Sequence, residues 1–297
     1  MIVPVRRHED SFVFTPAAPG ERLRVLVLSS DAPHHLYLQS ELAASLEVRG
    51  AVVEPGAEQQ RRLWRAGKRI DWAARLWQVE RQRMTGRSRL ERAYFGGLTD
   101  AGRIEAIPRL VVGSANEPAA VDWIRAIRPD VSVVCGTMYL CCSVLAHTGL
   151  TINVHGGCLP DYRGNHAVFF AYCRRDYEKI AATLHLVTPE LDGGEIVEVV
   201  YPDVRPGDDD ERLYCRSVHA AIDRLRDILV ELEAGATLRC YRQPYEGAMY
   251  RHRDRTPFRE LALWARRRTG RQRVPELPAE TRNTHAATGR PEPRAAA

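Results

Sequence analysis

Two polar side chains stand near the end of an apolar segment in the middle of the chain. The segment TINVH, residues 151–155, has the apolar content of a buried strand, yet it contains Asn153 and His155 two positions apart. Residues at this spacing project from the same face of a strand, so both side chains can reach one bound atom. An amide and an imidazole that converge in this way can donate hydrogen bonds to a developing oxyanion.

A carboxylate follows in a second turn. Asp192 lies in the segment PELDGGEIV, between two strand-like stretches and just before two glycines. An aspartate buried beside a histidine stabilises the protonated imidazole. Asn153, His155 and Asp192 therefore form a set that suits acyl transfer, with two donors for the oxyanion and one carboxylate to orient a base.

An α/β fold is needed to bring these residues together, and the sequence predicts one. The apolar run 23–29 is typical of a strand buried on both faces, residues 34–50 have helical spacing and residues 51–54 follow as a strand. Strand-like and helix-like segments alternate again from residue 108 onward. We therefore expect a Rossmann-like, mostly parallel sheet with helices on both faces. Ligands of such sheets bind beyond the carboxyl ends of the strands, where Asn153 and His155 are expected.

Changes in composition divide the chain into parts. We expect an N-terminal arm at 1–21 and a main domain at 22–235, interrupted by an Arg- and Trp-rich helical insertion at 57–95. A short C-terminal subdomain is expected at 236–274. The Pro-, Ala- and Arg-rich residues 275–297 are predicted to be a disordered tail.

Composition excludes several classes of protein. No apolar run reaches the roughly 18 residues of a membrane span, and the N-terminal residues lack the pattern of a signal peptide, so we expect a cytoplasmic protein without a membrane partner. The seven cysteines show no CxxC spacing, and we expect no metal site. From Arg251 to the end, 12 arginines face 5 acidic residues, which leaves the preceding residues with a net charge of −2. A nucleic-acid partner is therefore not expected.

The three chemical motifs occur together in one known family. The stretch from RPDVSVVCG to INVHGGCLPDYRG, followed by AATLHLVTPELDGGEIV, resembles the 10-formyltetrahydrofolate-dependent formyltransferases, which act on glycinamide ribonucleotide, methionyl-tRNA or amino sugars. The resemblance covers about residues 105–200. It implies that 22–235 is a formyltransferase catalytic domain and that 10-formyltetrahydrofolate is the cosubstrate.

The resemblance also implies roles for particular residues. Asn153 and His155 correspond to the pair that stabilises the oxyanion while an amine attacks the formyl carbon, and Asp192 corresponds to the carboxylate that keeps the histidine protonated and helps to remove the amine proton. The positions that correspond to the pterin-binding residues are Tyr139, Leu140, Cys141, Gly193 and Gly194. The positions expected to contact the acceptor are Pro160, Arg163, Asn165 and Asn116, and His34 and His35 are expected to face the same side.

The acceptor is expected to be a small amine. The N-terminal hundred residues resemble formyltransferase-like proteins of surface-sugar synthesis, which favours a nucleotide-linked amino sugar, and a homodimer is one expected assembly. A methionyl-tRNA formyltransferase-like enzyme and a non-catalytic folate- or nucleotide-binding module are the alternatives. Metal-assisted hydrolysis by His155, His166, His185 and Asp192 is disfavoured because no HExxH spacing occurs. A dinucleotide-dependent oxidoreductase is disfavoured because no GxGxxG follows the first strand.

Overall fold

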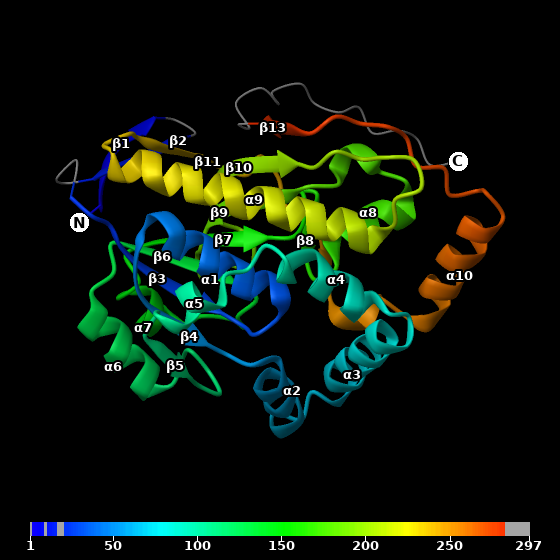
Figure 1. Ribbon diagram of the computed structural model, residues 1–297, viewed down its shortest axis with the longest axis horizontal. Coiled ribbons are helices and arrows are strands. Elements are labelled where there is room, and N and C mark those ends of the chain that lie inside the picture. Colours follow the sequence, from blue (N-terminus) through cyan, green and yellow to red (C-terminus); the bar gives the residue numbers. More distant parts are fainter. Residues whose placement is uncertain (1, 9–10, 17–20, 283–297) are drawn as a thin grey trace.

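One large sheet organises the molecule (Figure 1). The computed structural model describes residues 2–8, 11–16 and 21–282. Neighbouring strands follow the order β1-β2-β11-β10-β9-β7-β6-β3-β4-β5, and β13 pairs with β10. The predicted fold class, an α/β sheet flanked by helices and carrying a helical insertion, is confirmed. Among the described residues, no helix combines the length and apolar content that crossing a membrane requires.

The centre of the sheet is parallel, as predicted. Its five neighbouring strands are β3 (Arg24–Ser29), β4 (Glu47–Val53), β5 (Arg109–Val111), β6 (Val131–Cys135) and β7 (Leu150–His155). Four of them are mostly apolar because helices cover both of their faces. Cys135 ends β6 and His155 ends β7, so both residues lie at the carboxyl edge of the sheet.

Beyond β7 the pairing becomes antiparallel. The antiparallel strands are β9 (Ala182–Leu186), β10 (Ile196–Tyr201), β11 (Leu238–Tyr241), β2 (Ser11–Pro16), β1 (Ile2–His8) and β13 (Glu280–Arg282). A mostly parallel arrangement therefore describes the centre of the sheet from β5 to β7. Residues assigned to the N-terminal arm and to the C-terminal subdomain both contribute strands to the same sheet, through β1, β2 and β11.

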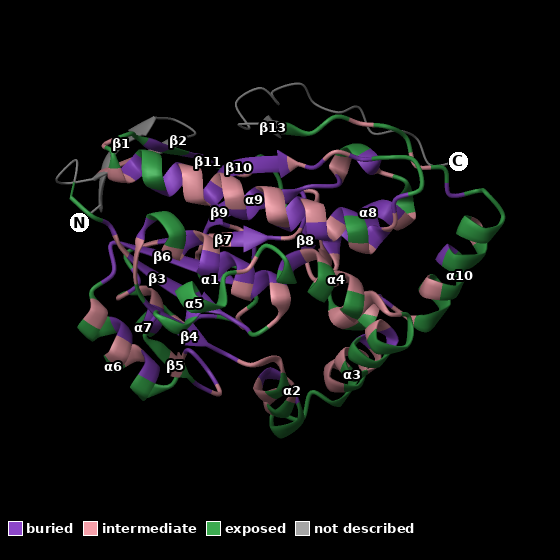
Figure 2. Ribbon diagram, viewed as in Figure 1, coloured by how far each residue is buried: buried purple, intermediate pink, exposed green. Residues whose placement is uncertain are grey.

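Helices bury the two faces of the parallel strands separately (Figure 2). Alternate residues of β3 point to opposite faces, so Val25 and Val27 pack in one core cluster and Leu26 and Leu28 in another. The first cluster includes α1 (Pro33–Ser45) and α9 (Asp210–Glu233), and the second includes α6 (Pro118–Ile127) and α7 (Cys142–Leu145). A third cluster surrounds α8 (Ala167–Arg174).

The predicted insertion consists of helices that pack on this framework. They are α2 (Gly56–Arg65), α3 (Arg69–Met84) and α4 (Arg87–Gly96), and α5 (Ala101–Glu105) follows them. A cluster of buried charges joins the insertion to the start of α9 and to the segment formed by η2 (His252–Asp254) and α10 (Pro257–Arg268). Its members are Arg81, Arg87, Arg255, Asp210, Glu211 and Glu260. Opposite charges balance in this cluster, which reduces the cost of burying them.

A small parallel sheet holds the loop after β7. In it, β8 (Tyr162–Gly164) pairs with β12 (Ala248–Tyr250), and Asn165 N–H donates to the Tyr250 carbonyl at 2.8 Å. A short helix, η1 (Tyr177–Lys179), precedes β9. The C-terminal segment therefore supports the same loop that follows Asn153 and His155.

Two boundaries differ from the sequence-based expectation. The first helix ends at Ser45 rather than Gly50, because residues 47–53 form β4. Gly50 marks a close approach instead of a helix end, since a Cβ atom at this position would collide with the Trp123 side chain. The tail predicted from residue 275 is wrong for its first residues: Val204 and Leu277 exchange backbone hydrogen bonds, and β13 pairs with β10. Residues 283–297 lie outside the described part of the chain.

The buried charge cluster leads to a prediction about stability. The Asp210 side chain is 1% exposed and accepts hydrogen bonds from Arg87 and Arg255. Asp210→Asn leaves two buried guanidinium groups without this charge, and we expect it to lower the free energy of unfolding by about 3 kcal/mol in urea titrations. The control is Asp122→Asn on α6, where the carboxylate is 72% exposed and pairs with Arg125, and about 0.5 kcal/mol or less is expected. Equal losses in the two variants would contradict this description of the cluster.

Candidate active site

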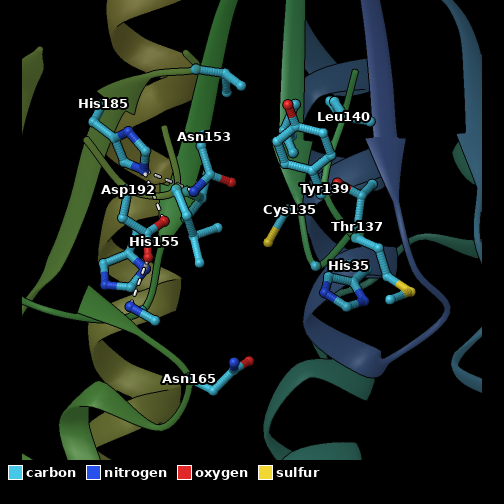
Figure 3. A pocket seen from close by; sticks show the side chains of 18 of the residues that line it. His35, Cys135, Thr137, Tyr139, Leu140, Asn153, His155, Asn165, His185 and Asp192 are labelled. Atoms are coloured by element: carbon cyan, nitrogen blue, oxygen red, sulfur yellow. Dashed lines mark hydrogen bonds and ion pairs between the residues drawn. The ribbon is translucent and has the colours of Figure 1, made fainter. Parts of the chain in front are cut away.

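The three residues singled out from the sequence converge at the carboxyl edge of the sheet. His155 Nδ1 lies 3.7 Å from Asp192 Oδ2, and both side chains are buried. Asn153 reaches the same place through His185, because its Nδ2 donates to His185 Nε2 at 2.9 Å and His185 Nε2 lies 3.7 Å from Asp192 Oδ1. Asp192 therefore lies between two imidazole rings (Figure 3).

His185 is a site residue that the sequence analysis considered only for a disfavoured metal-dependent hydrolysis. Strand β9 runs antiparallel to β7, and His185 is the direct partner of Asn153 in that pairing. Opposed residues of neighbouring strands project from the same face, so the two side chains meet. In the sequence, the short separation between His185 and Asp192 was the one indication that His185 belongs to the site. This separation becomes informative only once β9 is known to run antiparallel to β7. His185 Nδ1 donates to the Leu186 carbonyl at 2.8 Å, which leaves Nε2 as the acceptor for Asn153.

A close backbone approach fixes the orientation of His155. Its Nε2 lies 2.9 Å from the Tyr162 carbonyl oxygen, in the loop after β7. A Cβ atom at Gly157 would lie 2.6 Å from this Nε2 and 2.8 Å from that oxygen, so only glycine permits the contact. Because Nε2 is bonded to the Tyr162 carbonyl, Nδ1 is the ring nitrogen of His155 that can contact a ligand. Nδ1 is also the nitrogen that faces Asp192.

These residues form one wall of a cavity of about 270 Å³. Asn153, His155, His185 and Asp192 line this wall, and the turn residues Glu190 and Leu191 extend it. The opposite wall comes from the end of β6, the residues that follow it and the start of α1 (Figure 3). Its lining residues are His34, His35, Cys135, Gly136, Thr137, Met138, Tyr139 and Leu140.

The two histidines of the opposite wall bond to groups outside the cavity lining. The metal-ligating atoms of His34, His35 and Cys135 lie within 4.8 Å of one another. However, His35 Nδ1 accepts the Ala32 N–H at 3.1 Å, so its Nε2 carries the hydrogen and has no lone pair for a metal. His34 Nδ1 bonds to Glu91 Oε1 at 2.6 Å, and contacts with Cys135 and Glu91 raise the pKa of His34 to about 9 although burial opposes the shift. This set fits a hydrogen-bonded wall better than a metal centre.

The residues expected to bind a pterin ring are only partly at the cavity. Tyr139 and Leu140 line it, whereas Cys141 does not. Asn116, expected on the acceptor side, instead braces this stretch: its side chain donates to the Tyr139 carbonyl at 2.7 Å and accepts the Cys141 N–H at 2.9 Å. These two bonds occupy main-chain groups of Tyr139 and Cys141. At Leu140 they leave both the N–H and the carbonyl available to a ligand.

The remaining predicted binding residues mostly support the cavity from behind. Asn165 lines it, but Pro160 and Arg163 do not. Arg163 is buried and donates to Glu190 at 2.9 Å and to the Leu191 carbonyl at 2.5 Å, so it holds the turn that contains Asp192. Gly193 and Gly194 also lie outside the lining, and a Cβ atom at Gly194 would collide with the Leu186 carbonyl.

Gln243 was not expected near the site. Its side-chain amide donates to the Asp192 carbonyl at 2.7 Å and to the Gly194 carbonyl at 2.8 Å, which ties both ends of the turn together. Asp192 itself has a φ of 51°, a left-handed conformation that favours glycine and needs such support. No short motif surrounds Gln243, and its role depends on the C-terminal segment folding back over the loop after β7.

Electrostatics keep the Asp192 carboxylate ionised. Burial alone would raise its pKa, but the nearby imidazole of His155 and the Gly164 N–H at 2.7 Å lower it below its ordinary value. Burial lowers the pKa of His185 to about 4, and the Asp192 charge only partly opposes this shift. At neutral pH, His185 is therefore a neutral ring that accepts from Asn153.

This shift predicts a dependence of stability on pH. The pKa of His185 falls from 6.5 in the unfolded chain to about 4 in the folded protein, so the unfolded state takes up this proton first as the pH falls. Stability is therefore lost between pH 6.5 and about 4, by up to ~3 kcal/mol from this residue. We expect His185→Gln to make urea-derived stability less steep across this window by about one proton. A slope identical to that of the wild type would show that His185 does not titrate this way.

A family model and several solved structures are similar to this chain. Residues 84–228 match the formyl transferase family model. A provisionally assigned sugar N-formyltransferase of Mycobacterium tuberculosis has a TM-score of 0.50 and 15% identity over 81% of this chain and 85% of that one. A phosphoribosylglycinamide formyltransferase of Anaplasma phagocytophilum has a TM-score of 0.48 and 20% identity over 72% and 88%. A sugar N-formyltransferase of a Shewanella species has a TM-score of 0.48 and 15% identity over 77% and 76%.

The matched region bears directly on the site. It extends from the end of α3 into α9 and contains Asn153, His155, His185 and Asp192. The match to the formyl transferase family model agrees with the resemblance found in the sequence motifs over this part of the chain.

Proposed function

We propose that this enzyme transfers a formyl group from 10-formyltetrahydrofolate to a primary amine of a small metabolite. The observation that carries the proposal is the convergence of Asn153, His155 and Asp192 at one wall of the cavity. Formyl transfer needs donors for an oxyanion and a base for the amine proton, and this wall supplies both.

Each of the three side chains has one part in the proposed reaction. When the amine attacks the formyl carbon, the carbonyl oxygen becomes an oxyanion that accepts from Asn153 Nδ2 and from His155 Nδ1. Asn153 has a second N–H for this purpose, because His185 takes up only one. The Asp192 carboxylate compensates the positive charge on His155 and receives the amine proton, directly or through water. Collapse of the tetrahedral centre then breaks the bond to the donor nitrogen, which takes up a proton.

The cavity suits the reacting ends of the two substrates. Its volume of about 270 Å³ is near the lower limit of typical ligand pockets, roughly 300–1,000 Å³, so the longer parts of both substrates extend beyond it. Tyr139 and Leu140 form an apolar side of the cavity, and the main-chain N–H and carbonyl of Leu140 are available there. A flat heterocycle with hydrogen-bonding edges requires both an apolar surface and such main-chain groups. This side is where we place the pterin ring.

A nucleotide-linked amino sugar is the acceptor that we favour. The fold is shared with a provisionally assigned sugar N-formyltransferase over 85% of that chain, and the N-terminal motifs point the same way. A tRNA acceptor is disfavoured because residues 236–274 form β11, β12 and α10 rather than a barrel. A location in the cytoplasm and a homodimeric assembly stay predictions.

Substitution of the converging residues tests the proposal. His155→Ala removes an oxyanion donor and Asp192→Asn removes the compensating charge, and we expect either change to lower the rate of formyl transfer from 10-formyltetrahydrofolate roughly 100-fold or more. His147→Ala is the control, since His147 contacts Arg125 away from the cavity and normal rates are expected. The proposed chemistry is wrong if either site variant, correctly folded, turns over at the rate of the wild type.

Gln243 gives a second test, directed at positioning. Gln243→Leu removes two hydrogen bonds to the Asp192 turn, and we expect kcat to fall roughly tenfold while KM for the folate changes little. Gln272→Leu is the matched control, because Gln272 is buried and bonds the Tyr172 carbonyl elsewhere, so it lowers stability without lowering kcat. If kcat falls in both variants in proportion to their loss of folding stability, Gln243 has no positioning role.

A further inference from the structure

Helix α10 presents its apolar side to solvent. It lies at the periphery of the molecule and most of its residues are exposed (Figure 2). Phe258 is 82% exposed, Leu261 61% and Trp264 57%, and Ala265 is exposed as well. Because residues three and four positions apart share one face of a helix, Phe258, Leu261 and Ala265 form a single stripe. An ordinary surface helix has the reverse arrangement, with its apolar stripe toward the core and its polar side in water.

The exposed apolar surface continues onto the end of α3. Met84, the last residue of α3, is 64% exposed and lines a groove between α3 and α10 together with Leu261 and Trp264. Apolar side chains that are exposed side by side indicate a surface that another apolar body covers. We call Met84, Phe258, Leu261 and Trp264 the α10 surface.

Positive charge accompanies the α10 surface. Residues 257–273 contain six arginines and one acidic residue, Glu260, which is bonded to Arg255 and Arg81. Residues 56–84, which form α2 and α3, contain eight basic and three acidic side chains. Together the two segments carry a formal charge of +10, whereas the whole chain carries +5, so the remaining residues carry −5. The charge of the protein is therefore strongly polarised toward the helices that carry the exposed apolar side chains.

Two of the arginines on α10 are available to an external anion. Arg259 and Arg268 are exposed, and no described carboxylate lies within ion-pair distance, 4.0 Å, of either side chain. Their guanidinium groups lie near aromatic rings instead, 5.4 Å from the ring centre of Phe170 for Arg259 and 5.6 Å from that of Trp264 for Arg268. An anion can therefore approach both guanidinium groups without displacing an ion pair.

We propose that the α10 surface binds to a membrane that contains anionic lipids. The apolar stripe enters the boundary between headgroups and acyl chains while the arginines contact lipid phosphates, as in an interfacial amphipathic helix. Such binding needs no spanning helix, so the lack of a spanning segment, on which the sequence-based expectation of no membrane partner rested, does not oppose it. Helix α10 lies outside residues 84–228, which match the family model.

Apolar content and charge together favour a membrane over two other partners. In a two-fold contact with a second copy, the arginine-rich segment of one chain would lie against that of the other, and like charges would repel. A nucleic acid would neutralise the arginines but would leave the side chains of Phe258 and Leu261 without an apolar partner. An anionic membrane provides both negative charge and an apolar interior.

Co-sedimentation with vesicles tests the proposal. The full chain should bind vesicles of equal parts phosphatidylcholine and phosphatidylglycerol, and Phe258→Gln/Leu261→Gln should weaken this binding about tenfold or more. Val111→Gln is the matched control, because Val111 is 62% exposed on the edge strand β5, and its affinity should be unchanged. The replaced side chains are exposed, so Tm should not change in either variant. The proposal is overturned if the wild type does not bind these vesicles, or if the double variant binds them as tightly as the wild type.

A second pair of variants tests the role of the arginines. Arg259→Gln/Arg268→Gln should weaken binding to the same vesicles about tenfold. Arg49→Gln/Arg125→Gln removes the same charge from positions that are 51% and 60% exposed on β4 and α6, and its affinity should be nearly that of the wild type. Equal losses in the two pairs would mean that net charge alone drives binding, and would overturn the assignment to α10.

Two further measurements exclude the other partners. Lipids brominated in their acyl chains should quench the tryptophan fluorescence of the bound protein, and Trp264→Phe should remove most of the quenching; quenching that persists unchanged would overturn the proposal. Sedimentation equilibrium without lipid should give the same mass for the wild type and for Phe258→Gln/Leu261→Gln. A dimer that this double variant converts into a monomer would assign the α10 surface to a second copy and overturn the membrane assignment.

Discussion

The burial of one carboxylate, that of Asp192, between two imidazole rings is the constraint on which the site depends. A charge in this position is tolerated because His155 Nδ1 lies 3.7 Å from it and the Gly164 N–H donates to it at 2.7 Å. The two rings then differ in function. His185 is kept neutral by burial and orients Asn153, whereas His155 keeps its Nδ1 edge toward the carboxylate and the cavity. One ionised group thereby organises side chains on two strands, β7 and β9.

Segments distant in the sequence hold this arrangement. The C-terminal segment contributes Gln243 to the Asp192 turn and pairs β12 with the loop after β7. The insertion contributes Glu91, which bonds to His34 in the opposite wall of the cavity. A common charge cluster around Asp210 joins the two segments, so the insertion and the C-terminal residues are parts of one support for the cavity.

The sequence predicted what depends on local pattern. Apolar runs identified the parallel strands, and the Asn-x-His and Leu-Asp-Gly-Gly motifs identified Asn153, His155 and Asp192. Strand direction was not predictable, because β9 has the same apolar pattern in either direction, and the pairing of His185 with Asn153 was therefore missed. Bonds between distant segments were equally hidden: Asn116 and Arg163 were expected at the acceptor but brace the cavity from behind.

A crystal structure with a stable 10-formyltetrahydrofolate analogue tests the central claim most directly. The account predicts that the formyl-bearing nitrogen lies in the cavity, that the formyl oxygen lies within hydrogen-bond distance of Asn153 Nδ2 and His155 Nδ1, and that the pterin ring packs beside Leu140. An analogue bound with its formyl group away from Asn153 and His155, or in a different part of the molecule, would contradict it.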